Sequence, residues 1–127
     1  MNEQDIVMQW LEKAAEDLHS ADVLFGVGII ANTCYHCQQA AEKALKAYLC
    51  MVGVEIPHTH NLSLLCKECL EHNADFSEIF RISSSLTKYA TATRYPGDNL
   101  LNKEEAETAI QNAGRVLHFC ANLIAPE

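Results

Sequence analysis

The sequence predicts an all-α protein, an up-and-down antiparallel helical bundle of four long helices and one short helix. Apolar residues recur at alternating steps of three and four along several stretches, which is typical of helices that bury one side. No stretch alternates as a strand would, and short segments containing Gly, Pro or Asn separate the stripes. The chain has 127 residues, 49% of them hydrophobic, so we expect a single domain over residues 1–127 with one core.

The first two helices are predicted from the two longest stripes. Asn2 is expected to cap the first helix, and the Gly-Val-Gly segment 26–28 ends it. Gly53 stands where a left-handed C-terminal cap residue of the second helix belongs, and the short connection makes the two helices antiparallel. The stripes consist of Val7, Leu11, Ala14, Leu18, Ala21 and Phe25, and then of Ile30, Cys34, Cys37, Ala41, Ala44, Tyr48 and Val52.

A loop and a short third helix follow. Pro57 cannot continue a helix, so residues 54–61 are expected to form a loop. Asn61 is the expected cap of the short helix, which ends near Asn73. Its apolar positions are Leu62, Leu65, Cys66, Cys69 and Leu70.

Two further long helices are predicted from capping-box spacings. The fourth begins around Asp75 and Glu78 and stops at residues 95–97, and the fifth begins after Asn102. Gly114 lies inside the fifth helix, where glycine costs about 1 kcal/mol relative to alanine. We therefore expect a close helix crossing or a dimer contact at that point.

Composition excludes several classes of protein. The net charge of −8 disfavours non-specific binding to nucleic acid. The longest apolar stretch, residues 25–31, is far shorter than a membrane helix, and the acidic N-terminus does not resemble a secretory signal. We therefore expect a cytoplasmic protein with no membrane association, whose six cysteines are not paired in disulfides.

Two C-x-x-C pairs, residues 34–37 and 66–69, admit either a structural zinc site or core packing. Core packing is favoured because all four cysteines fall on apolar stripes, where a free cysteine behaves as a small hydrophobic residue. His58 and His60 alternate in the loop at residues 54–61, but no third metal ligand is near them in sequence. No metal site and no cofactor is therefore predicted.

The polar residues of the second helix form the most informative surface. They share one face, opposite the apolar stripe, and two interpretations stay open. One is a solvated face with an ion pair between Glu42 and Lys46. The other is a cationic platform for phosphate, to which Arg94 would add a planar, bidentate donor. The residues of the face are Gln38, Gln39, Glu42, Lys43 and Lys46.

Three blocks of sequence stand out: Gln-Gln-Ala-Ala-Glu-Lys-Ala-Leu-Lys-Ala at residues 38–47, Thr-His-Asn-Leu at residues 59–62, and Arg-Tyr-Pro at residues 94–96. Together they resemble the HEPN family, the higher eukaryotes and prokaryotes nucleotide-binding domain. The resemblance implies a helical bundle that commonly forms a homodimer. It also implies a nucleotide ligand, or a minimal nucleotidyltransferase as partner in a two-component, toxin-antitoxin-like system. The binding residues that it implies are Gln39, Glu42, Lys43, Lys46, His60, Arg94 and Tyr95.

Many HEPN proteins resemble metal-independent ribonucleases that use an arginine followed four to six residues later by a histidine. Arg81, Arg94 and Arg115 lack a histidine at that spacing, because His118 follows Arg115 too closely. The sequence therefore favours a non-catalytic binding module. Two alternatives are a dimeric interaction protein without a ligand, and a degenerate ribonuclease in which His60 replaces the missing histidine.

Overall fold

The computed structural model describes residues 1–91, 96 and 100–126 of the chain. Every regular element in these residues is helical, which confirms the all-α prediction. In chain order the elements are α1 (Glu3–Gly26), α2 (Ile30–Met51), α3 (Leu62–Leu70), the 3₁₀ segment η1 (Ala74–Glu78), α4 (Phe80–Leu86), the 3₁₀ segment η2 (Thr87–Ala90) and α5 (Lys103–Ile124).

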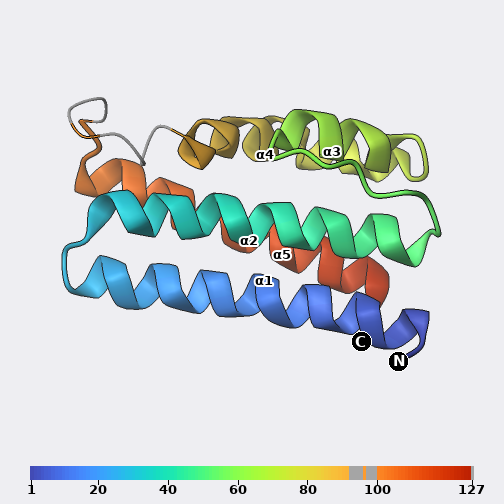
Figure 1. The fold of residues 1–127 in the computed structure, drawn as a ribbon. Coiled ribbons are helices and arrows are strands. Elements are labelled where there is room, and N and C mark those ends of the chain that lie inside the picture. Colours follow the sequence, from blue (N-terminus) through green and yellow to red (C-terminus); the bar gives the residue numbers. More distant parts are fainter. Residues whose placement is uncertain (92–95, 97–99, 127) are drawn as a thin grey trace.

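The three long helices α1, α2 and α5 lie side by side, and the shorter helices α3 and α4 cover the side of α2 that faces away from α1 (Figure 1). α2 is the central element because it contacts α1, α3, α4 and α5. Twelve of its 22 residues are buried. A helix enclosed from several sides must bury polar as well as apolar positions, and this determines where the candidate site lies.

The first two helices end as the sequence predicts. Both are followed by a glycine with positive φ, Gly28 at 81° and Gly53 at 79°. Gly53 N–H donates to the carbonyl of Cys50, and Val54 N–H donates to that of Leu49, which is the paired hydrogen bonding of a Schellman motif. Capping at the N-terminus is also confirmed, because the Asn2 side chain accepts from the backbone N–H of Asp5.

The fourth long helix was predicted incorrectly. In its place lie three short pieces, η1, α4 and η2. The start is capped by Asn73, which accepts from Asp75 N–H, and not by a box at Asp75 and Glu78. Residues 83–85 are all serine, and Ser85 Oγ donates to the carbonyl of Ile82 at 2.6 Å. These serines lie inside α4, and the helix is interrupted before them at Ile79, whose φ of −115° and ψ of 6° are not helical. The expected end at residues 95–97 falls mostly outside the described residues.

The core contains the cysteines of both C-x-x-C pairs. Their side chains are fully buried, which confirms that they pack as small hydrophobic residues. Burial raises the pKa of the Cys34 thiol to about 11 and that of Cys37 to about 12. Thiols in such surroundings are poor metal ligands and poor nucleophiles, since both roles require the thiolate.

Gly114 does not mark a close helix crossing within the chain. A Cβ built there would meet only Leu18 Cδ2, at 4.0 Å, which is an ordinary van der Waals distance. The prediction of a close crossing was therefore wrong for the described residues, whereas a dimer contact at Gly114 stays a prediction. Within the part of the chain that the structure describes, no helix is both long enough and apolar enough to cross a bilayer.

Candidate functional site

The polar face of α2 is not fully solvated, which argues against the first of the two interpretations that the sequence left open. Gln38 is fully buried and Glu42 is 4% exposed. The reason is the loop before α3, which runs over this part of α2 and brings the backbone of His60 onto the Gln38 side chain. Gln38 Nε2 donates to the His60 carbonyl at 3.0 Å. The face of α2 that lies opposite its apolar stripe is thus covered by the loop before α3.

Glu42 is the centre of a hydrogen-bond network between α2 and this loop. Its Oε1 accepts from Gln38 Nε2 at 3.1 Å and lies 2.8 Å from His60 Nδ1. Its Oε2 accepts from the Lys46 ammonium at 3.0 Å. Gln39 joins the edge of the network by donating to Gln38 Oε1 at 2.7 Å. We call Gln38, Gln39, Glu42, Lys46 and His60 the Glu42 network.

The protonation states within this network follow from its geometry. Burial alone would raise the pKa of Glu42, but hydrogen bonds from His60, Lys46 and Gln38 outweigh burial, so the pKa lies below its ordinary value. Glu42 is therefore ionised near neutral pH and can only accept hydrogen bonds. His60 Nδ1 must then carry the proton that it shares with Glu42. The other ring nitrogen, Nε2, has no partner among the described residues.

His60 and Lys46 differ in exposure. The His60 side chain is 63% exposed, whereas that of Lys46 is 12% exposed. Lys46 also lies over the ring of Trp10 on α1, with its Nζ 5.9 Å from the ring centroid. The Lys46 ammonium is therefore held between Glu42 and an aromatic ring. His60 is more accessible to solvent than either Glu42 or Lys46.

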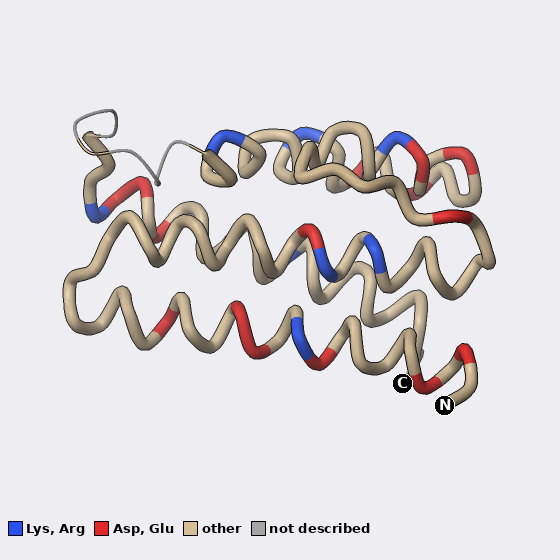
Figure 2. Tube along the Cα trace, viewed as in Figure 1, with Lys and Arg blue, Asp and Glu red and all other residues tan. Residues whose placement is uncertain are grey.

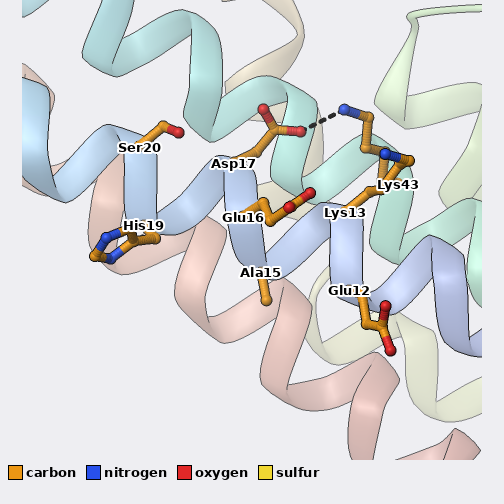
Figure 3. Close-up of a pocket in the computed structure, with 8 residues that line it drawn as sticks. All are labelled: Glu12, Lys13, Ala15, Glu16, Asp17, His19, Ser20 and Lys43. Atoms are coloured by element: carbon orange, nitrogen blue, oxygen red, sulfur yellow. Dashed lines mark hydrogen bonds and ion pairs between the residues drawn. The ribbon is translucent and has the colours of Figure 1, made fainter.

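Lys43 belongs to a different network, which links α1 to α2. Its ammonium donates to Asp17 Oδ2, as the dashed line in Figure 3 shows. Asp17 Oδ1 lies 2.8 Å from His36 Nδ1. Asp17 is 8% exposed, so this carboxylate is also largely removed from water. We call Asp17, His36 and Lys43 the Asp17 network.

The two networks share one design, a buried carboxylate between a lysine and the Nδ1 of a histidine. The predicted cationic platform is therefore largely neutralised inside the protein, because Lys43 and Lys46 each face a carboxylate. A ligand anion at this face would have to compete with Glu42 or Asp17, or be attracted by a protonated imidazole.

Sequence reasoning missed Asp17 and His36. A signal for Asp17 was available, since it follows Ala14 by three residues and precedes Ala21 by four, and so lies on a buried stripe of α1. A charged residue at a core position requires an internal partner. His36 carried no comparable signal.

The remaining predicted residues are distributed unevenly. Arg94 and Tyr95 lie outside the described residues. His58 is exposed in the loop before α3. Among the described residues, no three His, Cys, Asp or Glu side chains lie close enough together to hold a metal ion.

Comparison with known proteins shows the family of the chain. A sequence model of the HEPN domain matches residues 7–123. The chain belongs to the HEPN family. A similar solved structure is TT1696 from Thermus thermophilus, with 30% identity, coverage of 91% of this chain and 96% of that chain, and a TM-score of 0.82. Another is ST0689, an archaeal HEPN homologue, with 29% identity, coverage of 93% and 97%, and a TM-score of 0.78. No curated protein matches the chain.

The HEPN fold brings together two of the three sequence blocks that suggested the family. Gln38 and Glu42 of the first block bond directly to His60 of the second. In this HEPN protein the two blocks therefore contribute to one structural feature, the attachment of the loop at residues 54–61 to α2. Of the third block, only Pro96 is among the described residues, and it is exposed.

Proposed function

We propose that this HEPN protein is a non-catalytic binding module that holds the phosphate of a nucleotide at the Glu42 network. The observation that supports this most is the position of the two ring nitrogens of His60. Its Nδ1 is fixed by a buried carboxylate while its Nε2 is directed away from that bond on a side chain that is 63% exposed. A histidine positioned in this way presents one ring nitrogen to a ligand.

The charge of the network sets the conditions for binding. With neutral His60, the charges of Glu42 and Lys46 balance. Protonation of the imidazole leaves one net positive charge, because Glu42 and Lys46 are the charged groups that face it from the described elements. A phosphate ligand should therefore bind more tightly when the imidazole carries this extra proton. Arg94 and Tyr95 are further proposed contacts, on the basis of the family resemblance.

The test is calorimetric titration with nucleoside triphosphates at pH 6 and pH 8. We expect at least fivefold tighter binding at pH 6, and loss of that difference in His60→Ala. Lys46→Ala should weaken binding at both pH values. His72→Ala and Lys67→Ala, which change exposed residues of the α3 region, serve as matched controls. No heat with any nucleotide, or unchanged affinity in His60→Ala, would refute this site.

A protein partner is the second part of the proposal. The family resemblance favours a minimal nucleotidyltransferase and a homodimer, and the supporting observation here is the acidic exposed side of α1, described below. Co-expression with a candidate nucleotidyltransferase, followed by size-exclusion chromatography and light scattering, gives the stoichiometry. Separate elution of the two proteins would argue against the pair.

The alternative of a degenerate ribonuclease gains one observation. A histidine held through Nδ1 by a carboxylate is also the arrangement of a general base. RNA that is cleaved by the wild type and left intact by His60→Ala would favour this function over simple binding.

A further inference from the structure

A shallow groove follows the surface of α1, and its central and last parts also include Lys43 and His36 of α2. Three hollows lie along the helix, and each shares residues with the next. The first is lined by Ile6, Trp10 and Lys13, and the central one, of about 860 Å³, also includes Lys13. The central hollow shares His19 and Ser20 with the third. From the first hollow to the last, the groove covers residues 6–24, or about 27 Å of helix.

The two ends of this groove are apolar. At one end Ile6 is 40% exposed beside Trp10. At the other end Val23 is 53% exposed, and Val27 follows it at 69%. An amphipathic helix docks through apolar anchors at defined spacings, and these exposed side chains are the apolar contacts that the groove can offer to it.

Carboxylates outnumber lysines in the middle of the groove, where Glu12, Glu16 and Asp17 stand with Lys13 and Lys43. Glu12 and Glu16 line the central hollow and have no ion-pair partner among the described residues, while Asp17 is occupied by Lys43 (Figure 3). Figure 2 shows acidic residues spread along the length of α1 with a single basic residue among them. The acidic residues of α1 are Glu3, Asp5, Glu12, Glu16, Asp17 and Asp22, and Lys13 is the one lysine.

A second copy of the chain offers no matching surface on its long helices α1, α2 and α5. The lysines of α2 are ion-paired to Asp17 and Glu42. α5 is itself acidic, with three glutamates against one lysine and one arginine. Two copies that met through α1 would place like charges against each other, which is unfavourable.

We infer that the α1 groove binds a basic amphipathic helix of a partner protein. The fitting helix has about 20 residues, an apolar anchor near each end, and lysine or arginine residues between the anchors. The inference deepens the proposed partner-binding role. It does not depend on the nucleotide site, because neither Glu12, Glu16 nor Val23 belongs to the Glu42 network.

Trp10 provides a direct readout, because it is the only tryptophan of the chain and lines one end of the groove. The probe is a synthetic alanine-based helical peptide of about 22 residues without aromatic side chains, with leucines at both ends and lysines between. A second peptide carries glutamate in place of every lysine. We expect a saturable change of Trp10 fluorescence with the lysine peptide alone, which weakens as salt is raised.

Three double variants complete the experiment. Glu12→Gln with Glu16→Gln, and Val23→Ser with Val27→Ser, should each weaken binding of the lysine peptide at least tenfold. Glu71→Gln with Glu78→Gln removes two exposed charges outside α1, at the end of α3 and in η1, and should leave binding unchanged. Circular dichroism checks that all variants are folded.

Several outcomes would overturn the inference. They are the absence of a saturable signal, equal weakening by the Glu71 and Glu78 control, and a wild-type dimer that Val23→Ser with Val27→Ser converts to monomer. Nucleotide titrations of the same variants separate this inference from the proposed ligand site. Glu12→Gln with Glu16→Gln should not weaken nucleotide binding, whereas His60→Ala should not weaken peptide binding.

Discussion

At the scale of single residues, Glu42 shows how a charge becomes tolerable inside a helical bundle. It is 4% exposed, and its two oxygens meet donors from Gln38, Lys46 and His60. Two of the partners, Gln38 and Lys46, come from α2 itself. His60 then joins from a segment 18 residues away. The Glu42 side chain therefore links the loop before α3 to α2, and it also positions the residues of the proposed ligand site.

Glu42→Gln keeps the shape of the side chain but removes its charge. We expect the free energy of unfolding at pH 7 to fall by about 2 kcal/mol, because the Lys46 ammonium would lose its partner at a site that is largely buried. Urea denaturation followed by circular dichroism measures the change. Glu71→Gln, on the surface, should stay within about 0.5 kcal/mol of the wild type.

The pH dependence of this difference has a defined sign. The pKa of Glu42 is lower in the folded protein than in the unfolded chain, so the folded state binds this proton more weakly. The contribution of Glu42 is therefore fully present above the unfolded-state pKa and is lost as the pH falls through the folded-state pKa. We expect the stability gap between the wild type and Glu42→Gln to close only as the pH falls below the ordinary glutamate pKa of 4.5 and through the lower folded-state pKa. A gap that stays constant down to pH 3 would contradict the assignment.

Cysteine reactivity should separate one thiol from the other five. Cys50 is partly exposed at the end of α2, whereas Cys34, Cys37, Cys66, Cys69 and Cys120 are buried. Because the thiolate is the reactive form, the buried thiols with raised pKa values should react slowly with a chromogenic disulfide reagent. We expect one fast thiol in the native protein and six in urea. Cys50→Ser should remove the fast phase, and a fast phase that survives would show that a core cysteine is accessible.

At the scale of elements, the helix ends are specified locally and the helix interiors depend on their neighbours. Asn2, Asn61 and Asn102 cap α1, α3 and α5 through their own side chains, each within two or three residues of its bonding partner. Such caps can be read from the sequence because everything that they need is adjacent. The broken segment from η1 to η2 was not predicted, because its apolar stripe is compatible with a continuous helix and does not reveal the non-helical backbone at Ile79.

Two glycines with opposite roles give a paired test at this scale. Gly53 has a φ of 79°, so Gly53→Ala should lower the free energy of unfolding by about 1–2 kcal/mol. Gly114 lies in an ordinary helical conformation with room for a methyl group, so Gly114→Ala should raise it by about 0.5–1 kcal/mol.

Thermal or urea unfolding of both glycine variants measures these two changes in the free energy of unfolding. Destabilisation by Gly114→Ala would show that the added methyl group is not accommodated. A change of oligomeric state in Gly114→Ala, seen by light scattering at equal stability, would instead support the dimer contact predicted from the sequence.

At the scale of the whole molecule, the sequence predicted the layers better than the site. Apolar periodicity located the three long helices and the cores of α3 and α4, because burial repeats with the helical turn. It placed Gln38 and Glu42 on a surface, because periodicity within one helix does not reveal that a distant loop will cover the opposite face. His36 and Asp17 were missed for the same reason. Their pairing depends on how α1 and α2 are aligned, which is a property of two elements together.

The pairing of α1 with α2 also has a consequence for how the chain reaches this structure. The two helices are consecutive, are joined by the turn at residues 27–29, and are connected across their seam by Asp17 with His36 and Lys43. The entropy lost in closing so short a connection is small, so this hairpin can form before any distant contact exists. α5 comes from the other end of the chain and must complete a much larger loop. We therefore expect a folding nucleus in the first half of the sequence, with the docking of α5 as the later event that closes the core.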